Sequence, residues 1–140
     1  ICRLQLTINS VMDGCTVAPF GSAVNGFWSP QSDIDICLQV AGAGNRPAQI
    51  KVLRRVANEL HRLSSHYIEP RFSAKIPIIH WAPRTPGLMS CDISVNNTLA
   101  VVNSQLIGAY SAIDERLRVL GLAIKYWAKA RGINDRSRGT

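Results

Sequence analysis

Hydrophobic residues recur along this chain at two different spacings, and these spacings predict its helices and strands. Apolar residues three or four positions apart predict helices over 1–12 and 47–64, from about 99, and over 114–131. Short runs of β-branched and other apolar residues predict strands over 16–20, 33–40, 66–75, 77–81 and 90–95. The order α-β-β-α-β-β-β-α-α predicts an α+β fold whose last two helices begin a second, helical domain.

Glycine and proline positions place the ends of these elements. Gly14 ends the first predicted helix, and Gly21 ends the first predicted strand. Pro47 suits the first turn of a helix, whereas Gly132 suits the position just after the last one. The Arg-Thr-Pro-Gly segment over 84–87 predicts a turn between two strands.

Length and composition limit the class of protein. The chain has 140 residues, of which 46% are hydrophobic and 18% charged, which suits one domain or one domain with the start of another. No apolar run approaches the ~18 residues that a membrane span needs, so no membrane partner is predicted. No signal peptide is visible, and the start at Ile1 without an initiator Met predicts a fragment of a longer protein.

The four cysteines indicate a compartment rather than a metal site. They show neither a Cys-x-x-Cys pair nor a His at zinc-finger spacing, so zinc is not predicted. Cys37 and Cys91 lie inside apolar runs, which predicts buried free thiols in a reducing intracellular compartment. This pattern does not distinguish the cytoplasm from the mitochondrion.

Basic residues outnumber acidic ones. Sixteen Lys and Arg against nine Asp and Glu give a net charge of +7. Seven of the basic residues and three of the acidic ones lie in 114–140, so +4 of that charge is found in the last fifth of the chain. Such an excess is typical of proteins that bind nucleic acid, although solubility alone would explain it equally well.

Three aspartates form the candidate chemical centre. Asp33 and Asp35 are two positions apart on a predicted strand and therefore point the same way. Asp92 lies on a later strand, and if the two strands are neighbours, three carboxylates converge. Crowded carboxylates repel one another and favour a bound cation, for which Mg²⁺ is the oxygen-preferring candidate. The alternative for each aspartate is a turn cap or an ion pair with arginine, and Asp33 and Asp35 alone do not decide between the two interpretations.

A Gly-Ser pair ahead of these aspartates favours the functional interpretation. Gly21 and Ser22 follow a predicted strand and precede Asp33 by ten residues. At the start of a short helix such a pair offers backbone N–H groups and a hydroxyl to a phosphate. Either motif alone is common, but Gly-Ser, then Asp-x-Asp, then a strand Asp 57 residues later is a much rarer combination.

These segments resemble a known family. Segments 20–26, 32–38 and 91–100 resemble the motifs of the terminal nucleotidyltransferases, which belong to the DNA polymerase β-like superfamily. Segments 74–79 and 114–140 are similar to one branch of them, the terminal uridylyltransferases and the related cytoplasmic-type poly(A) polymerases. The resemblance implies a nucleotidyltransferase mixed sheet flanked by helices over 1–107. It also implies that 108–140 is the truncated start of a helical central domain.

The resemblance also implies roles for individual residues. Asp33, Asp35 and Asp92 would hold two Mg²⁺ or Mn²⁺ ions, and Asp92 would also act as the base for the RNA 3′ hydroxyl. The nucleotide-binding residues it implies are Gly21, Ser22, Asn97, Lys125 and Lys129, with Ser104 nearby. Lys125 and Lys129 are four apart on one helical face, as a pair that neutralises a triphosphate requires, although a solvated helix face has the same spacing. Arg71 and Lys75 are weaker candidates for contact with the RNA backbone.

The implied reaction is template-independent addition of a nucleotide to an RNA 3′ end. UTP is the first candidate substrate, giving UMP transfer and pyrophosphate, and ATP is the second, because the family's base-selecting residues lie beyond Thr140. A second-messenger synthase or an antibiotic nucleotidyltransferase of the same fold would share the Gly-Ser pair and the three aspartates. Segment 96–100 and the two lysines argue against these enzymes. An inactive RNA-binding or scaffolding subunit is the alternative from another class, and the presence of all three aspartates argues against it.

Overall fold

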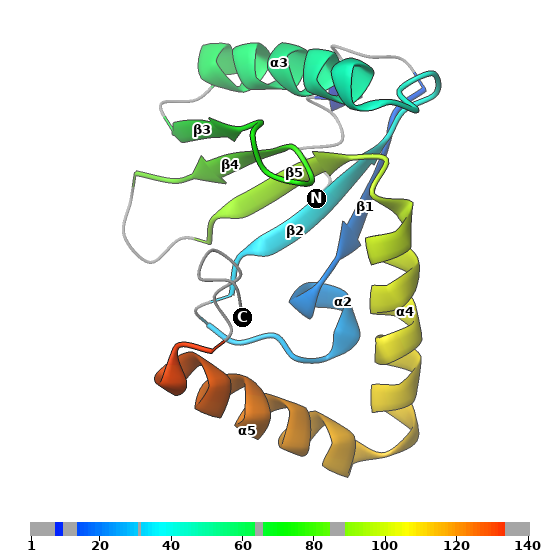
Figure 1. Cartoon of the computed structure of the whole chain (residues 1–140), viewed down its shortest axis with the longest axis vertical. Coiled ribbons are helices and arrows are strands. Elements are labelled where there is room, and N and C mark those ends of the chain that lie inside the picture. The colour runs from blue at the N-terminus through cyan, green and yellow to red at the C-terminus, as the bar shows by residue number, and fades with distance from the viewer. Residues whose placement is uncertain (1–7, 10–13, 31, 64–65, 85–88, 134–140) are drawn as a thin grey trace.

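A five-stranded mixed sheet forms the centre of the molecule (Figure 1). The structure, a computed structural model, describes residues 8–9, 14–30, 32–63, 66–84 and 89–133. The strands are β1 (Thr16–Phe20), β2 (Ile34–Gln39), β3 (Tyr67–Arg71), β4 (Ile78–Ala82) and β5 (Cys91–Val95). They lie in the order β1-β2-β5-β4-β3, in which only the pair of β2 and β5 is parallel.

The helices whose bounds the described residues define are α2 (Ser22–Asn25), α3 (Arg46–Leu63), α4 (Thr98–Ile113) and α5 (Glu115–Arg131). Helix α3 covers one face of the sheet, α4 runs beside β1, and α5 crosses below α2 (Figure 1). The Asp114 carboxylate accepts the N–H of Arg116 at the start of α5, and Gly132 ends that helix in the left-handed conformation. The predicted α+β architecture is thus confirmed, and the expected domain boundary at 107–108 lies inside α4.

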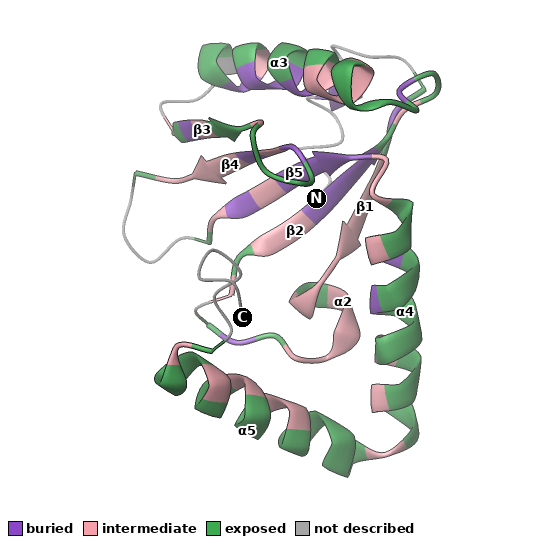
Figure 2. Cartoon of the chain, in the orientation of Figure 1, coloured by how far each residue is buried: buried purple, intermediate pink, exposed green. Residues whose placement is uncertain are grey.

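The hydrophobic core lies between α3 and the sheet (Figure 2). Strand alternation directs Ile36 and Leu38 of β2 and Ile93 of β5 into this core. Helix α3 meets them with a stripe spaced by three and four positions, namely Leu53, Val56, Ala57 and Leu60. The residues that alternate with the core positions point to the opposite face, which α3 does not cover.

Four strand predictions need correction at their ends, and two of them, over 77–81 and 90–95, differ by one residue from Ile78–Ala82 and Cys91–Val95. The strand predicted over 66–75 ends at Arg71, because the Arg46 guanidinium donates to the carbonyl oxygens of Phe72, Ala74 and Lys75 and so stabilises a turn there. The strand predicted over 33–40 is shorter at both ends. The predicted helix over 1–12 and the turn over 84–87 fall largely outside the described residues.

Two further findings concern the buried cysteines and the membrane. Cys37 and Cys91 are buried free thiols, as predicted, and Cys15 is buried as well. No helix within the described ranges is long and apolar enough to cross a membrane.

Candidate active site

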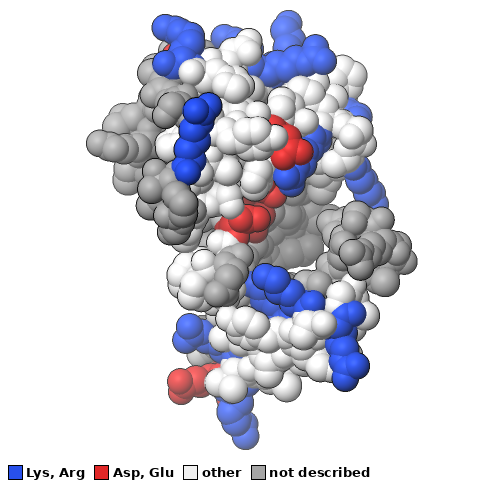
Figure 3. Space-filling model, turned by 90° about the vertical axis from the view of Figure 1, so that its left-hand side faces the viewer, with Lys and Arg blue, Asp and Glu red and all other residues white. Residues whose placement is uncertain are grey.

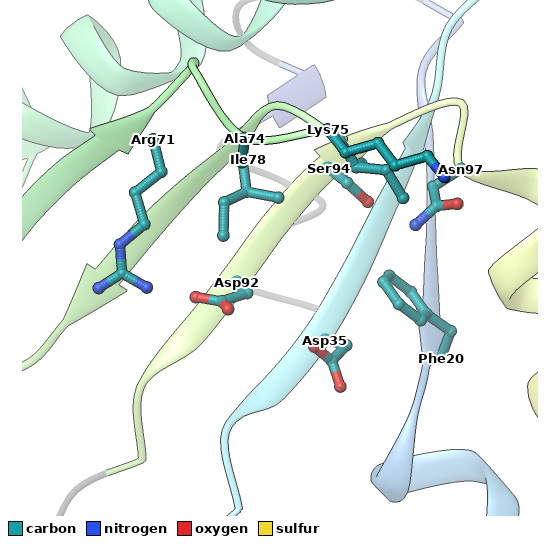
Figure 4. A pocket seen from close by; sticks show the side chains of 10 residues that line it. Phe20, Asp35, Arg71, Ala74, Lys75, Ile78, Asp92, Ser94 and Asn97 are labelled. Atoms are coloured by element: carbon teal, nitrogen blue, oxygen red, sulfur yellow. The ribbon is translucent and has the colours of Figure 1, made fainter. Parts of the chain in front are cut away.

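Two of the three predicted aspartates face each other on the sheet face that α3 leaves open. Asp35 of β2 and Asp92 of β5 are directly paired in the parallel register, so their side chains lie on the same face (Figure 4). This placement confirms that the strands bearing them are neighbours. The convergence follows from the strand order, since β5 is inserted between β2 and β4.

Asp33 lies one residue before β2 rather than within it. Its carboxylate accepts a hydrogen bond from the Ser90 hydroxyl, and the Ile34 N–H donates to the Ser90 carbonyl oxygen at 2.9 Å. Ser90 therefore joins the start of β2 to the start of β5. This contact fixes Asp33 at the edge of the site, where its side chain remains exposed.

The electrostatic environment of Asp35 favours a cation. Burial, together with the charges of Asp92 and Asp33, raises the pKa of Asp35 to about 6, and the charge of Lys125 acts in the opposite direction. Figure 3 shows acidic atoms at the waist of one face, with basic atoms above and below them. A cation bound here would relieve the repulsion between the carboxylates and lower the pKa of Asp35 again.

Gly21 forms the turn that brings the start of α2 to Asp35. Its φ of 67° and ψ of −146° suit only glycine, and a Cβ there would collide with the Asp35 carboxylate. The Gly21 N–H donates to the Ser104 hydroxyl at 2.7 Å, so this N–H is already used. Ser104 itself is buried behind Gly21 and also donates to the Ala100 carbonyl oxygen. Ser104 thus supports the turn and does not border either of the two clefts described next.

One cleft lies between the open face of the sheet and α5. It has a volume of about 320 Å³ and is lined by Ser22, Ser29, Ser32, Asp33, Asp35, Lys125, Tyr126 and Lys129. The Lys125 ammonium donates to the Phe27 carbonyl oxygen and to the Ser32 hydroxyl, each at 2.9 Å. Lys125 therefore joins α5 to the 26–33 loop, while the ammonium group of Lys129 makes no hydrogen bond or ion pair with the side chain or backbone of another described residue. The cleft presents hydroxyls and two ammonium groups beside the carboxylates.

A second cleft of about 690 Å³ continues from Asp35 and Asp92 toward the turn after β3 (Figure 4). Phe20 and Asn97 border it on the side of β1 and α4, Arg71 borders it on the side of β3, and Lys75 extends over it from the turn toward Asn97 (Figure 4). The Arg71 guanidinium is paired with Glu69 at 2.8 Å, whereas Lys75 is exposed on the turn that Arg46 holds. Asp35 borders both clefts, so groups bound in the two clefts would meet at the carboxylates.

The carboxylates alone do not form a closed metal site. Within the described ranges, no group of three or more His, Cys, Asp or Glu is arranged so that it could hold a metal ion. Mg²⁺, however, is commonly held by one or two carboxylates together with water and substrate phosphate oxygens. The oxygen donors of Asp35 and Asp92, facing each other beside a hydroxyl-lined cleft, fit that kind of coordination.

Sequence reasoning missed the residues that hold the aspartates in place. His80 of β4 contacts Asp92, with 2.6 Å between its Nδ1 atom and the Asp92 Oδ1 atom. Ser90 binds Asp33, and Ser32 binds Lys125. No local sequence pattern indicates these contacts, because each joins segments that are far apart in the sequence and are brought together only by the fold.

Comparison with known proteins finds poly(A) RNA polymerases and a terminal uridylyltransferase among the relatives of this chain. The chain matches, over residues 1–112, the family model described as the central palm domain of mitochondrial-like poly(A) RNA polymerase. It is 39% identical over 145 residues to the poly(A) RNA polymerase GLD2 of Danio rerio, and this alignment covers 99% of this chain and 29% of that protein. It is 36% identical over 141 residues to terminal uridylyltransferase 7 of Homo sapiens, and this alignment covers 99% of this chain and 9% of that protein.

A solved structure shares the fold. The Cid1 poly(U) polymerase with MgGTP bound superposes with a TM-score of 0.80 at 27% identity, which covers 96% of this chain and 42% of the Cid1 chain. The chain spans less than a third of the length of each of the two curated relatives named above.

Proposed function

We propose, on the premise that this chain belongs to the family of mitochondrial-like poly(A) RNA polymerase central palm domains, that it adds nucleotides to the 3′ end of RNA without a template. The nucleotide would come from a nucleoside triphosphate, and pyrophosphate would leave. The observation that carries this proposal is the facing pair of Asp35 and Asp92 beside a cleft that bears Lys125 and Lys129. Paired carboxylates beside ammonium groups provide for both a cation and a polyanion.

Two Mg²⁺ or Mn²⁺ ions would be held by Asp35, Asp92 and Asp33, completed by water and phosphate oxygens, and would stabilise the charges of the attacking and leaving oxygens. The relatives support this assignment to the extent that the Cid1 structure contains MgGTP. The raised pKa of Asp35 is the physical indication from this chain itself.

The chain's own residues would bind and orient both substrates. Lys125 and Lys129 would neutralise the triphosphate, and Ser22 would donate its hydroxyl to a phosphate oxygen. Asn97 would contact the ribose from the other cleft. Asp92 would accept the proton of the RNA 3′ hydroxyl, with Arg71 and Lys75 along the path of the RNA backbone. Most of the rate enhancement would come from positioning and charge neutralisation.

The base of the nucleotide is proposed as uracil, with adenine as the second candidate. Identity to a poly(A) polymerase and to a uridylyltransferase is nearly equal, so the relatives favour both. The compartment is proposed as intracellular and reducing, because Cys37 and Cys91 are free and buried. We also keep the division into a catalytic domain over 1–107 and the start of a helical domain over 108–140 as a proposal.

The test of this function is primer extension with the full-length protein. One labelled RNA is incubated with Mg²⁺ and with each of the nucleoside triphosphates separately, and product length is measured on a denaturing gel. Extension with UTP supports the first candidate, and extension with ATP supports the second. An RNA that stays unextended with every nucleotide contradicts the proposal and favours the scaffold alternative.

Replacing each of the two lysines of α5 should distinguish an effect on nucleotide binding from an effect on protein stability. Lys125→Met and Lys129→Met should each raise the KM for the nucleotide roughly tenfold, since each removes a charge facing the triphosphate. Lys125→Met should also lower the free energy of unfolding by about 1–3 kcal/mol, because it loses its two hydrogen bonds to the 26–33 loop. Lys129→Met should leave the melting temperature unchanged. Equal melting temperatures for the two variants would contradict this assignment.

A further inference from the structure

A row of side chains crosses four strands on the open face of the sheet. The register pairs Asp35 with Asp92, Asp92 with His80, and His80 with Glu69. Directly paired residues point to the same face, so the row runs from β2 through β5 and β4 to β3. The proposed function uses Asp35 and Asp92 from this row and gives His80 no role.

His80 makes one well-defined contact within the row. Its Nδ1 atom lies 2.6 Å from the Asp92 Oδ1 atom, and the two side chains are only 17% and 23% exposed. An ionised carboxylate can only accept hydrogen bonds, so Nδ1 carries the proton and donates it to Asp92. A short charge-assisted bond that is largely shielded from water fixes both partners more firmly than an exposed bond would.

Glu69, on the other side of His80 in the row, does not compete with Asp92 for the imidazole. Glu69 is the alternative acceptor, but its carboxylate accepts from the Arg71 guanidinium at 2.8 Å. The pKa of Glu69 is lowered mainly by this hydrogen bond from Arg71. Because the Glu69 carboxylate is bonded to the Arg71 guanidinium, the imidazole of His80 bonds to Asp92 of β5.

Asp92 needs such a restraint. The terminal torsion of an aspartate side chain has a broad preference, so the side chain alone does not fix the plane of its carboxylate. Asp35 is directly opposite and repels Asp92, which would turn the carboxylate away from the place where both aspartates meet the substrates. The bond to His80 engages one oxygen of Asp92, which borders the cleft, and leaves the other oxygen outside this bond.

We propose that His80 is the positioning residue of this site, which holds the Asp92 carboxylate in the orientation needed to bind a divalent cation and to accept the proton of the RNA 3′ hydroxyl. This inference rests on the proposed function for its catalytic part. Its binding part can be measured without RNA or nucleotide. Residues that orient a metal-binding carboxylate in this way typically change affinity or activity 10–100-fold when they are replaced.

The test compares replacements that differ only in where they place a donor. His80→Ala removes the donor, whereas His80→Asn places an amide N–H close to the former Nδ1 position. His80→Gln places its amide nearer the former Nε2 position. Mn²⁺ affinity is measured on the full-length protein by calorimetry without RNA or nucleotide, and kcat and KM for UTP and for ATP are measured in the extension assay. His61→Ala, an exposed histidine on α3, is the matched control.

We expect His80→Ala to weaken Mn²⁺ binding about tenfold and to lower kcat about 10–100-fold, with KM for the nucleotide changed by less than about threefold. His80→Asn should recover most of both losses, while His80→Gln should not. His61→Ala should match the natural protein. Unchanged Mn²⁺ affinity in His80→Ala, or equal losses in His80→Ala and His80→Asn, overturns the inference. If the natural protein extends no RNA, the proposed function fails, and the Mn²⁺ measurement still decides the positioning role.

Discussion

Asp35→Asn is expected to abolish RNA extension and, at the same time, to stabilise the metal-free protein. The activity should fall at least about 10³-fold, because a lost metal ligand removes several kcal/mol of charge stabilisation at 1.36 kcal/mol per tenfold change. The gain in stability has a different origin. Asparagine carries no charge, so it removes the repulsion that Asp92 and Asp33 impose on Asp35 and the cost of burying its charge.

The pH dependence of this gain follows from the pKa of Asp35, which is about 6 in the folded protein against an ordinary value of 3.8. A carboxyl whose pKa is raised on folding stabilises the fold while it is protonated. This contribution is fully present below about pH 4 and is lost as the pH rises through about 6. A shift of this size corresponds to roughly 3 kcal/mol, which solvent screening of the partly exposed side chain reduces to about 1–2 kcal/mol.

Thermal unfolding in the presence of a chelator measures this effect. Above about pH 6 the variant should melt a few degrees higher than the natural protein, and near pH 4 the two should converge. Glu59→Gln, which removes a carboxylate paired with Arg62 on α3, is the control for a change of net charge away from the site. A metal-free Asp35→Asn protein that is no more stable than the natural one at pH 8 would show that Asp35 is not under electrostatic strain.

Local patterns in the sequence predicted the elements that depend on local physics. The strand over 16–20 is β1 to the residue, and the left-handed Gly132 ends α5 as its position indicated. Alternation along β2 and β5 put Asp35 and Asp92 on the faces opposite to Ile36 and Ile93, which the core occupies. These features need only the period of a strand or the conformational freedom of glycine.

The rest of the site depends on contacts between distant segments, which no local pattern encodes. His80 reaches Asp92 only because β4 pairs with β5, and Ser90 reaches Asp33 only because β5 pairs with β2. The Ser104 hydroxyl is bonded to Gly21, 83 positions away in sequence, while its place near the nucleotide stays a prediction from the resemblance. The end of β3 was misjudged for the same reason, since Arg46 stabilises the following turn from another element.

Gly21→Ala is expected to lower kcat for RNA extension about 10²–10³-fold. An alanine Cβ would collide with the Asp35 Oδ2 atom and lie 2.9 Å from its Cγ atom, so the carboxylate would have to rotate out of the site. A displacement of about 1 Å in a reacting group can cost 10²-fold in rate. The backbone conformation of Gly21 adds a cost of about 1–3 kcal/mol in stability, since L-residues rarely adopt it.

Two comparisons separate displacement of Asp35 from backbone strain. Gly42 also has a positive φ, 77°, with no atom within 4 Å of an added Cβ, so Gly42→Ala should lose stability through strain and keep its activity. In an Asp35→Ala background the collision with the carboxylate disappears, and only the Cβ atom of residue 35 stays close, at 3.2 Å from the added Cβ. Gly21→Ala should then cost less stability than it does in the natural background, measured by thermal unfolding. If Gly21→Ala costs the same in both backgrounds, the glycine serves the turn alone, and the close approach of α2 to Asp35 does not constrain that carboxylate.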